Sequence, residues 1–176
     1  MRDEQQPDVF VTRSGVQLRL KAVPPMLIDQ VRGAVPFPKP PTYQVTTVAG
    51  SVEEYPHTPD TLTTDQEHAA FADYLARRQQ AEAEINGRVL DLFLYRGIDL
   101  EVPDNGWAED QAFFGVQVPD DPRARKIHYL KTEVFTTGED LVGFTLAMMN
   151  LTGVRQEVLD AVESSFQRAL QESAAA

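Results

Sequence analysis

The feature that most constrains the fold is a long run of helical periodicity in the middle of the chain. Apolar side chains recur about every 3.6 residues from Phe71 to Phe93, and alanines fill many positions between them. Thr64 and Glu67 have capping-box spacing, which marks a helix start. If the helix continues from there to Arg96, it has about 32 residues and is about 48 Å long at 1.5 Å per residue. A chain built around such an element must be largely helical.

The Asn86-Gly87 pair is the one weak point in this predicted helix. Glycine in a helix interior costs roughly 1 kcal/mol relative to alanine. Ile85 and Val89 are one helical turn apart, so the apolar stripe keeps its phase across the pair. We therefore expect one continuous helix, ended by Gly97.

The first third of the chain has β-type patterns. Two short β-prone runs, Val9–Thr12 and Val16–Leu20, flank a three-residue link that ends in Gly15. Such a link predicts a hairpin with Gly15 at positive φ. Pro24-Pro25 and Gly33 then bracket a short predicted helix, because proline suits the first helical turn and glycine the position past the end.

A proline-rich stretch, residues 36–41, follows this helix and favours an extended conformation. Residues 42–48 continue as a predicted extended segment. After a turn at Ala49-Gly50-Ser51, residues 52–55 are expected to return as its partner strand.

The segment after the long helix is expected to form a short strand and a capped turn. Ile98–Val102 alternates in polarity and predicts the strand. Asp104 or Asn105 is expected to cap a turn that ends at Gly115. This turn carries three aromatic residues: Trp107, Phe113 and Phe114.

Three helices are predicted after this turn. Pro122 opens one that runs through Val134, and Thr137 opens a second that ends near Leu151. Gly153 separates the second helix from a predicted last helix, whose apolar residues follow i,i+4 spacing. They are Val154, Val158, Val162, Phe166 and Leu170.

The fold class expected is α+β and mainly helical. Residues 1–61 form a small region of β-hairpin, short helix and proline-rich arm, and residues 62–176 form a helical body around one long central helix.

Composition excludes several classes of protein. Sixteen Lys and Arg against 27 Asp and Glu give a net charge of −11, which argues against a protein that binds nucleic acid by covering phosphates. The absence of cysteine excludes disulfide scaffolds, cysteine-ligated metals and thiol catalysis. The first eight residues are polar and acidic, unlike a signal peptide, and the most apolar stretch has eight residues, Val142–Met149, too few to span a membrane. A soluble intracellular protein is expected.

No pattern of residues predicts a catalytic, cofactor or metal site. His57, His68 and His128 lack metal-ligand spacing, and we expect one in an exposed loop and two on helix surfaces. The glycines never cluster into a phosphate-binding loop. Six acids and no bases lie between Lys39 and Arg77, a pattern typical of a solvated acidic face, or of one that mimics nucleic acid or meets a basic partner. The chain is therefore predicted not to be an enzyme.

Three stretches of the sequence resemble the tail assembly chaperone-type proteins of tailed bacteriophages and prophages. They read FVTRSGVQLRLKAVPPMLIDQV, PFPKPPTYQV and FADYLARRQQAEAEINGRVLDLFLYRGIDLEVP. In that group a short strand pair precedes a helix opened by VPP, a proline-rich link and a long helix, and the resemblance covers roughly residues 9–170. It implies a non-enzymatic helper that binds the tape-measure protein during tail assembly, and it implies no active-site residue and no cofactor.

The leading hypothesis is thus a phage or prophage assembly factor in the host bacterial cytoplasm. A structural virion component, such as a head–tail connector or minor tail protein, and an acidic inhibitor that mimics nucleic acid are the alternatives. Partners expected are the tape-measure or tail-tube proteins, with no nucleic acid and no membrane, and a homo-oligomer is left open. An apolar helix face offered to a helical client is the expected binding mode. The residues predicted to bind the client are Val158, Val162, Phe166 and Leu170.

Overall fold

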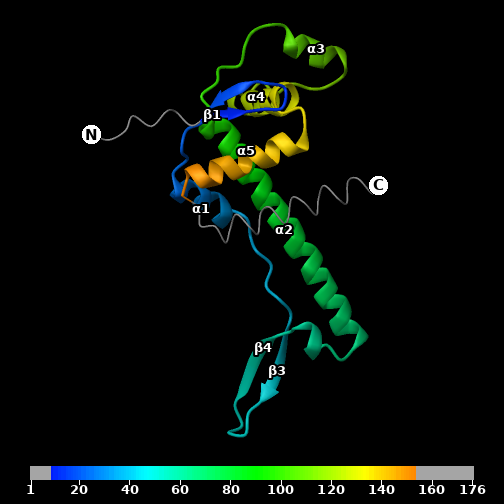
Figure 1. Cartoon of the computed structure of the whole chain (residues 1–176). Coiled ribbons are helices and arrows are strands. Elements are labelled where there is room, and N and C mark those ends of the chain that lie inside the picture. The colour runs from blue at the N-terminus through cyan, green and yellow to red at the C-terminus, as the bar shows by residue number, and fades with distance from the viewer. Residues whose placement is uncertain (1–8, 154–176) are drawn as a thin grey trace, which may run out of the picture. The chain divides into compact units, whose positions relative to one another are not determined.

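The computed structural model describes residues 9–153 (Figure 1). The described chain is α+β and mainly helical, with two small antiparallel strand pairs and one long helix, as the sequence predicts. It divides into two units. The described residues of the first are 9–30 and 89–153, and residues 31–88 form the second.

The predicted N-terminal hairpin is confirmed in the first unit. Strand β1, Val9–Val11, pairs antiparallel with β2, Gln17–Arg19. Gly15 in the connecting turn has φ 85°, the left-handed conformation that glycine adopts without steric cost. The side chain of Thr12 orders the turn, since its hydroxyl accepts a hydrogen bond from the Val16 amide at 3.1 Å.

The predicted strand at Ile98–Val102 is wrong. Ile98 forms a single antiparallel bridge with Leu20, the Asp99 amide donates to the Arg19 carbonyl at 3.1 Å, and residues 99–102 form no strand. The antiparallel register of this bridge would place residues 99–102 beside residues 19–16, that is, along β2. The hydrogen bonds to that edge end at Asp99, so the chain leaves β2 before a strand can form. Helix α1, Pro25–Gly33, follows β2 in the sequence.

Helix α2, Asp65–Gly97, has 33 residues and passes through Asn86 and Gly87 without interruption, as predicted. Its start has the expected capping box. The Glu67 amide donates to the Thr64 hydroxyl at 3.2 Å, and the Glu67 carboxylate accepts from the Thr64 amide at 2.9 Å. The amide and hydroxyl of Thr63 also donate to this carboxylate, at 2.7 and 2.9 Å. These hydrogen bonds, led by the one from the Thr63 amide, lower the pKa of Glu67 to about 2.

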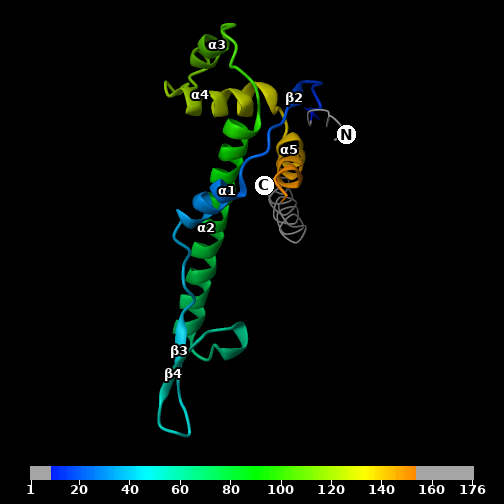
Figure 2. The ribbon, with the colours of Figure 1, turned by 90° about the vertical axis from the view of Figure 1, so that its left-hand side faces the viewer.

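The last described segment contains the two helices predicted to begin at Pro122 and Thr137, and the first of them ends in a turn of different geometry. Helix α4, Pro122–Tyr129, continues as one turn of π-helix, Leu130–Val134, and then ends. Helix α5, Gly138–Leu151, begins where Thr137 caps it. Figure 1 shows α5 along its length, and Figure 2 shows α4 along its length.

The core of the first unit lies where β2, α1, the end of α2, α4 and α5 meet. Phe135 and Phe144 stack at 5.0 Å between ring centroids, and Phe10 packs on both at about 6 Å. Besides Phe144, the large side chains that are fully buried are Leu18, Val23, Phe93, Leu94, Ile98, Leu130 and Met148.

The second unit pairs the first part of α2 with a proline-rich arm and a hairpin. Strand β3, Thr42–Thr46, and strand β4, Val52–Pro56, form the predicted second strand pair, followed by a 3₁₀ turn at Pro59–Thr61. The expectation of an exposed loop histidine is wrong for His57, which is 7% exposed. Its ring packs 5.0 Å from that of Tyr43, and its Nδ1 lies 3.2 Å from the Thr61 hydroxyl, so a local polar partner makes its burial tolerable.

Candidate protein-binding site

The residues predicted to bind a client, Val158, Val162, Phe166 and Leu170, lie outside the described residues. Of the remaining histidines, His68 is exposed on α2 and His128 is half-buried on α4. Within residues 9–153, no group of three or more acidic or histidine side chains is arranged to hold a metal ion. The structure directs attention instead to the short helix that follows α2.

Helix α3, Trp107–Phe113, is a single short element defined by glycines at both ends. Gly106 precedes it at φ 84°, and the Asn105 carboxamide oxygen accepts from the Trp107 amide at 3.4 Å. At the other end Gly115 has φ 76°, and its amide donates to the Ala112 carbonyl at 3.0 Å. This is the left-handed ending that glycine provides, and it turns the chain immediately after Phe114.

Trp107 attaches α3 to the rest of the first unit. It is 5% exposed, and its ring lies 5.1 Å from that of Tyr129 in an edge-to-face arrangement. The Arg125 guanidinium sits 5.3 Å from the centre of the indole, within cation–π distance. The His128 ring lies 6.1 Å away. One side of α3 is therefore firmly packed on α4.

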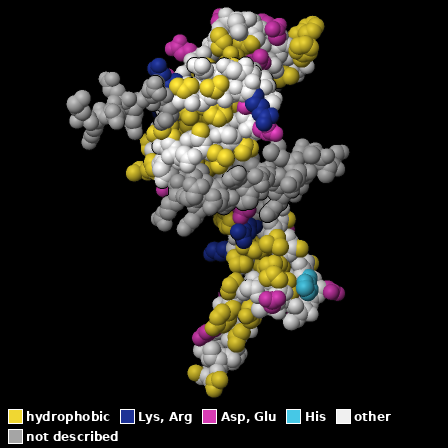
Figure 3. Space-filling view, viewed as in Figure 1, with side chains coloured by type: hydrophobic (Ala, Val, Ile, Leu, Met, Phe, Trp, Pro, Cys, Tyr) yellow, Lys and Arg dark blue, Asp and Glu magenta, His cyan; other side chains and the backbone are white. Residues whose placement is uncertain are grey.

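The opposite end of α3 presents two large aromatic side chains to solvent. Phe113 is 84% exposed and Phe114 is 77% exposed, and we call these two residues the aromatic pair. Their rings lie 5.4 Å apart at 81°, so they contact each other edge to face. Figure 3 shows hydrophobic side chains together with acidic ones at the α3 end of the first unit. Adjacent exposed phenylalanines on a short, capped element are typical of an interaction surface, whereas single exposed apolar residues are ordinary.

The surroundings of the aromatic pair are acidic. Glu109 and Asp110 are exposed on the same helix, and Gln111 donates from its side chain to Glu133 at 2.8 Å. Residues 112–117 are all exposed. A partner that covers the pair would thus meet an apolar centre with a negatively charged rim.

A shallow cleft of about 510 Å³ lies beside this element, between the loop after α2 and the start of α4. Its charged lining residues are Glu101, Asp104, Arg125 and Lys126. The Lys126 ammonium donates to the Ile98 carbonyl at 2.7 Å and the Tyr95 carbonyl at 3.2 Å, so it caps the end of α2. Burial lowers the pKa of Lys126. Its engagement with two carbonyls makes it a structural group rather than a free ligand for a small molecule.

Sequence reasoning placed Phe113 and Phe114 on a capped turn but did not identify them as a site. A signal was present. Glu109 and Asp110, one turn earlier, are both acidic, so neither phenylalanine belongs to an apolar stripe that could face a core.

Among the described residues, no helix has both the length and the apolar character that a membrane crossing needs. Comparison of the chain with protein-family models, with curated proteins and with solved structures gives no match.

Proposed function

We propose that this chain is a non-enzymatic protein-binding factor in phage or prophage tail assembly, of the chaperone type, whose client is the tape-measure protein. The observation that carries the protein-binding part is the exposure of the aromatic pair, Phe113 and Phe114, on a helix fixed by the buried Trp107. Central aromatic side chains dominate the energetics of most protein interfaces. The assignment to tail assembly rests on the sequence resemblance alone.

The acidic residues around the aromatic pair favour a client whose surface is apolar at its centre and basic at its border. An apolar groove bordered by Lys or Arg would bury both rings and would pair with Glu109 and Asp110. Complementary charge of this kind raises association rates and discriminates among partners. A helical client with an apolar stripe and flanking basic residues fits this description.

Co-expression with the tape-measure protein encoded in the same tail-gene cluster tests the proposal. Phe113→Ser/Phe114→Ser should abolish co-purification while the thermal midpoint stays unchanged, because both side chains are already in solvent. Met26→Ser is the matched control, since Met26 is 70% exposed in the same unit. Retention of the client by the double variant, or its loss in the control, would contradict this assignment of the surface.

A structural virion component is the second candidate, and the exposed β3–β4 hairpin supports it. Every residue of the two strands except Tyr43 is exposed, which suits an arm that joins neighbouring subunits. Mass spectrometry of purified particles separates the two functions, because an assembly chaperone leaves the particle and a subunit remains.

A further inference from the structure

The β3–β4 hairpin of the second unit has two open edges among the described residues, because its sheet contains only these two strands. Figures 1 and 2 both show it as a narrow ribbon beyond the start of α2. The exposed large apolar side chains on it and its turn are Val45, Val48, Val52 and Tyr55. An open edge carries backbone N–H and C=O groups that can pair with another strand.

The hydrogen-bond register shows which residues point outward. The Thr47 amide donates to the Ser51 carbonyl and the His57 amide donates to the Pro41 carbonyl, both at 2.8 Å. Hydrogen bonding alternates along an antiparallel pair, so Tyr43 and Val45 also bond inward to β4. The outward-pointing backbone groups of β3 are therefore those of Thr42, Gln44 and Thr46.

The two edges of the hairpin differ in chemistry. The outward residues of β3 all have an N–H group, and the strand Thr42–Thr46 contains no charged residue. The outward residues of β4 are Val52, Glu54 and Pro56 by the same register. Charge and proline are the features that protect a strand edge from pairing, and both occur on β4. Only the β3 edge is left unprotected.

We propose that β3 pairs antiparallel with β3 of a second copy of this chain, about a two-fold axis at Gln44. The resulting sheet has four strands in the order β4, β3, partner β3, partner β4. Gln44 faces Gln44 of the partner subunit, and Thr42 faces Thr46 of the partner subunit on each side of the axis. All these residues have outward backbone groups, so every facing pair exchanges both hydrogen bonds.

The side chains of this register are self-complementary. Tyr43 lies opposite Val45 of the partner subunit on one face, a pairing of aromatic with β-branched residue that stabilises sheets. The other face carries Thr–Thr and Gln–Gln pairs, and no charge meets a like charge. The proposed partner is a second copy of this chain. The β3 interface is separate from the client surface on α3.

Charge selects β3 over β4 as the pairing edge. A symmetric β4 pair would place Glu54 directly opposite its own copy, which destabilises a sheet. Pairing through β3 separates the two β4 strands by three strand spacings, or about 14 Å. This exceeds the Debye length of about 8 Å at physiological ionic strength, so repulsion between the Glu53-Glu54 segments is screened.

Sedimentation equilibrium of the full chain over a concentration series up to about 1 mM tests the proposal. The wild type should show a reversible monomer–dimer equilibrium. Gln44→Lys and Gln44→Glu should each weaken it about tenfold or more, because like charges then meet at the axis. An equimolar mixture of the two variants should restore association through Lys–Glu pairs.

Glu54→Lys is the matched control on the opposite edge. It changes the net charge from −11 to −9, whereas Gln44→Lys changes it from −11 to −10. If only overall repulsion mattered, both Lys variants would associate more strongly than the wild type. The proposal requires Gln44→Lys to associate less and Glu54→Lys to remain at least as strong as the wild type.

Cross-linking gives a second readout that uses the absence of native cysteine. Gln44→Cys places two thiols at the axis, with Cα atoms about 5.5 Å apart, a separation that a disulfide spans. Mild oxidation should yield a covalent dimer from Gln44→Cys and little from Glu54→Cys. Equal cross-linking of both variants, a monomeric wild type at the highest concentration, or no rescue in the mixture would overturn the proposal. Phe113→Ser/Phe114→Ser should dimerise normally, which separates this inference from the proposed function.

Discussion

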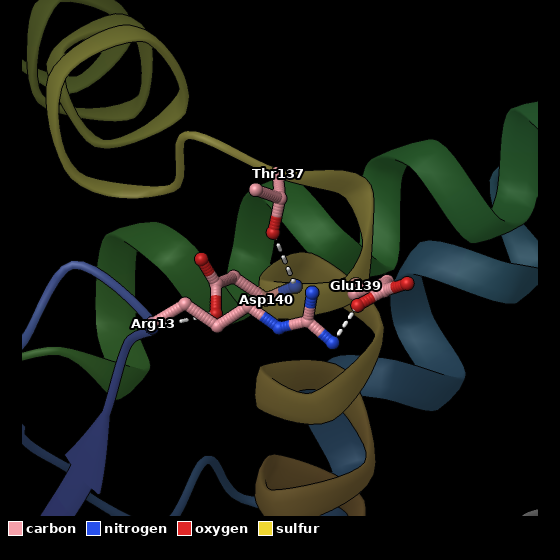
Figure 4. A network of polar contacts seen from close by, with 4 residues as sticks. All are labelled: Arg13, Thr137, Glu139 and Asp140. Carbon is pink, nitrogen blue, oxygen red and sulfur yellow. Dashed lines mark hydrogen bonds and ion pairs between the residues drawn. The ribbon is translucent and has the colours of Figure 1, made fainter.

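The backbone amide of Arg13 donates a hydrogen bond to Oδ1 of Asp140 at 3.0 Å, across 127 positions of the sequence (Figure 4). It connects the β1–β2 turn to the first turn of α5. Asp140 occupies the helix position from which an acidic side chain usually reaches back to the cap residue. Here its own amide still donates to the Thr137 hydroxyl at 3.2 Å, but its carboxylate binds the distant turn. The acidic residue at this capping position therefore makes a tertiary contact instead of the local hydrogen bond of a capping box.

Removal of this carboxylate should be costly because the Asp140 side chain is buried. Asp140 is 4% exposed, so Asp140→Ala leaves the Arg13 amide without its acceptor and should lower the free energy of unfolding by about 1–3 kcal/mol. Asp140→Asn keeps an acceptor and should cost less. Glu139→Ala is the control, since its ion pair with Arg13 is half exposed and contributes at most about 1 kcal/mol. Urea denaturation of the three variants measures the differences, and an equal effect of Asp140→Ala and Glu139→Ala would refute the role of burial.

Two glycines of α2 should respond in opposite directions to the same substitution. No atom lies within 4 Å of a Cβ built on Gly87, so Gly87→Ala should stabilise the protein by up to about 1 kcal/mol. A Cβ on Gly97 would clash with the terminal methyl carbon of Met148, a side chain that is fully buried. Gly97→Ala should therefore destabilise by about 1–3 kcal/mol through overpacking. Chemical denaturation of both variants is the measurement, and stabilisation by both would show that Met148 repacks freely.

The capping carboxylate of α2 should make stability depend on pH in acid. Hydrogen bonds hold the pKa of Glu67 at about 2 in the folded chain, below its ordinary value of 4.5. A lowered pKa stabilises the folded state above pH 4.5, and this contribution is lost as the pH falls from 4.5 through about 2. The stability difference between the wild type and Glu67→Gln should consequently be constant at neutral pH and shrink across this range. Thermal midpoints measured from pH 7 to pH 2.5 test it, and a difference that does not change with pH would contradict it.

Local patterns in the sequence were sufficient for the elements whose determinants are local. The capping box at Thr64 and Glu67, the apolar phase from Ile85 to Val89 and the glycine at position 15 all act within one or two turns. Periodicity therefore predicted α2 and the hairpins correctly.

Features that depend on distant residues were missed for the same physical reason. Whether residues 99–102 form a strand depends on whether they stay paired with β2, about 80 positions earlier, and the burial of His57 depends on Tyr43 of β3. The exposure of Phe113 and Phe114 depends on which side of α3 Trp107 attaches to α4. No short window of sequence contains that information.

Trp107 is the only tryptophan, so its fluorescence reports on the packing of α3 alone. Because the side chain is 5% exposed and lies against Tyr129 and Arg125, its emission should be blue-shifted and poorly quenched by iodide. Phe113→Ser/Phe114→Ser should leave both properties unchanged, since those rings point into solvent. Tyr129→Ala should instead raise iodide quenching, because it removes the edge-to-face contact that holds the indole. Should the wild-type emission already match that of free tryptophan, α3 would not be docked in solution, and the aromatic pair would lack the fixed support on which its proposed role depends.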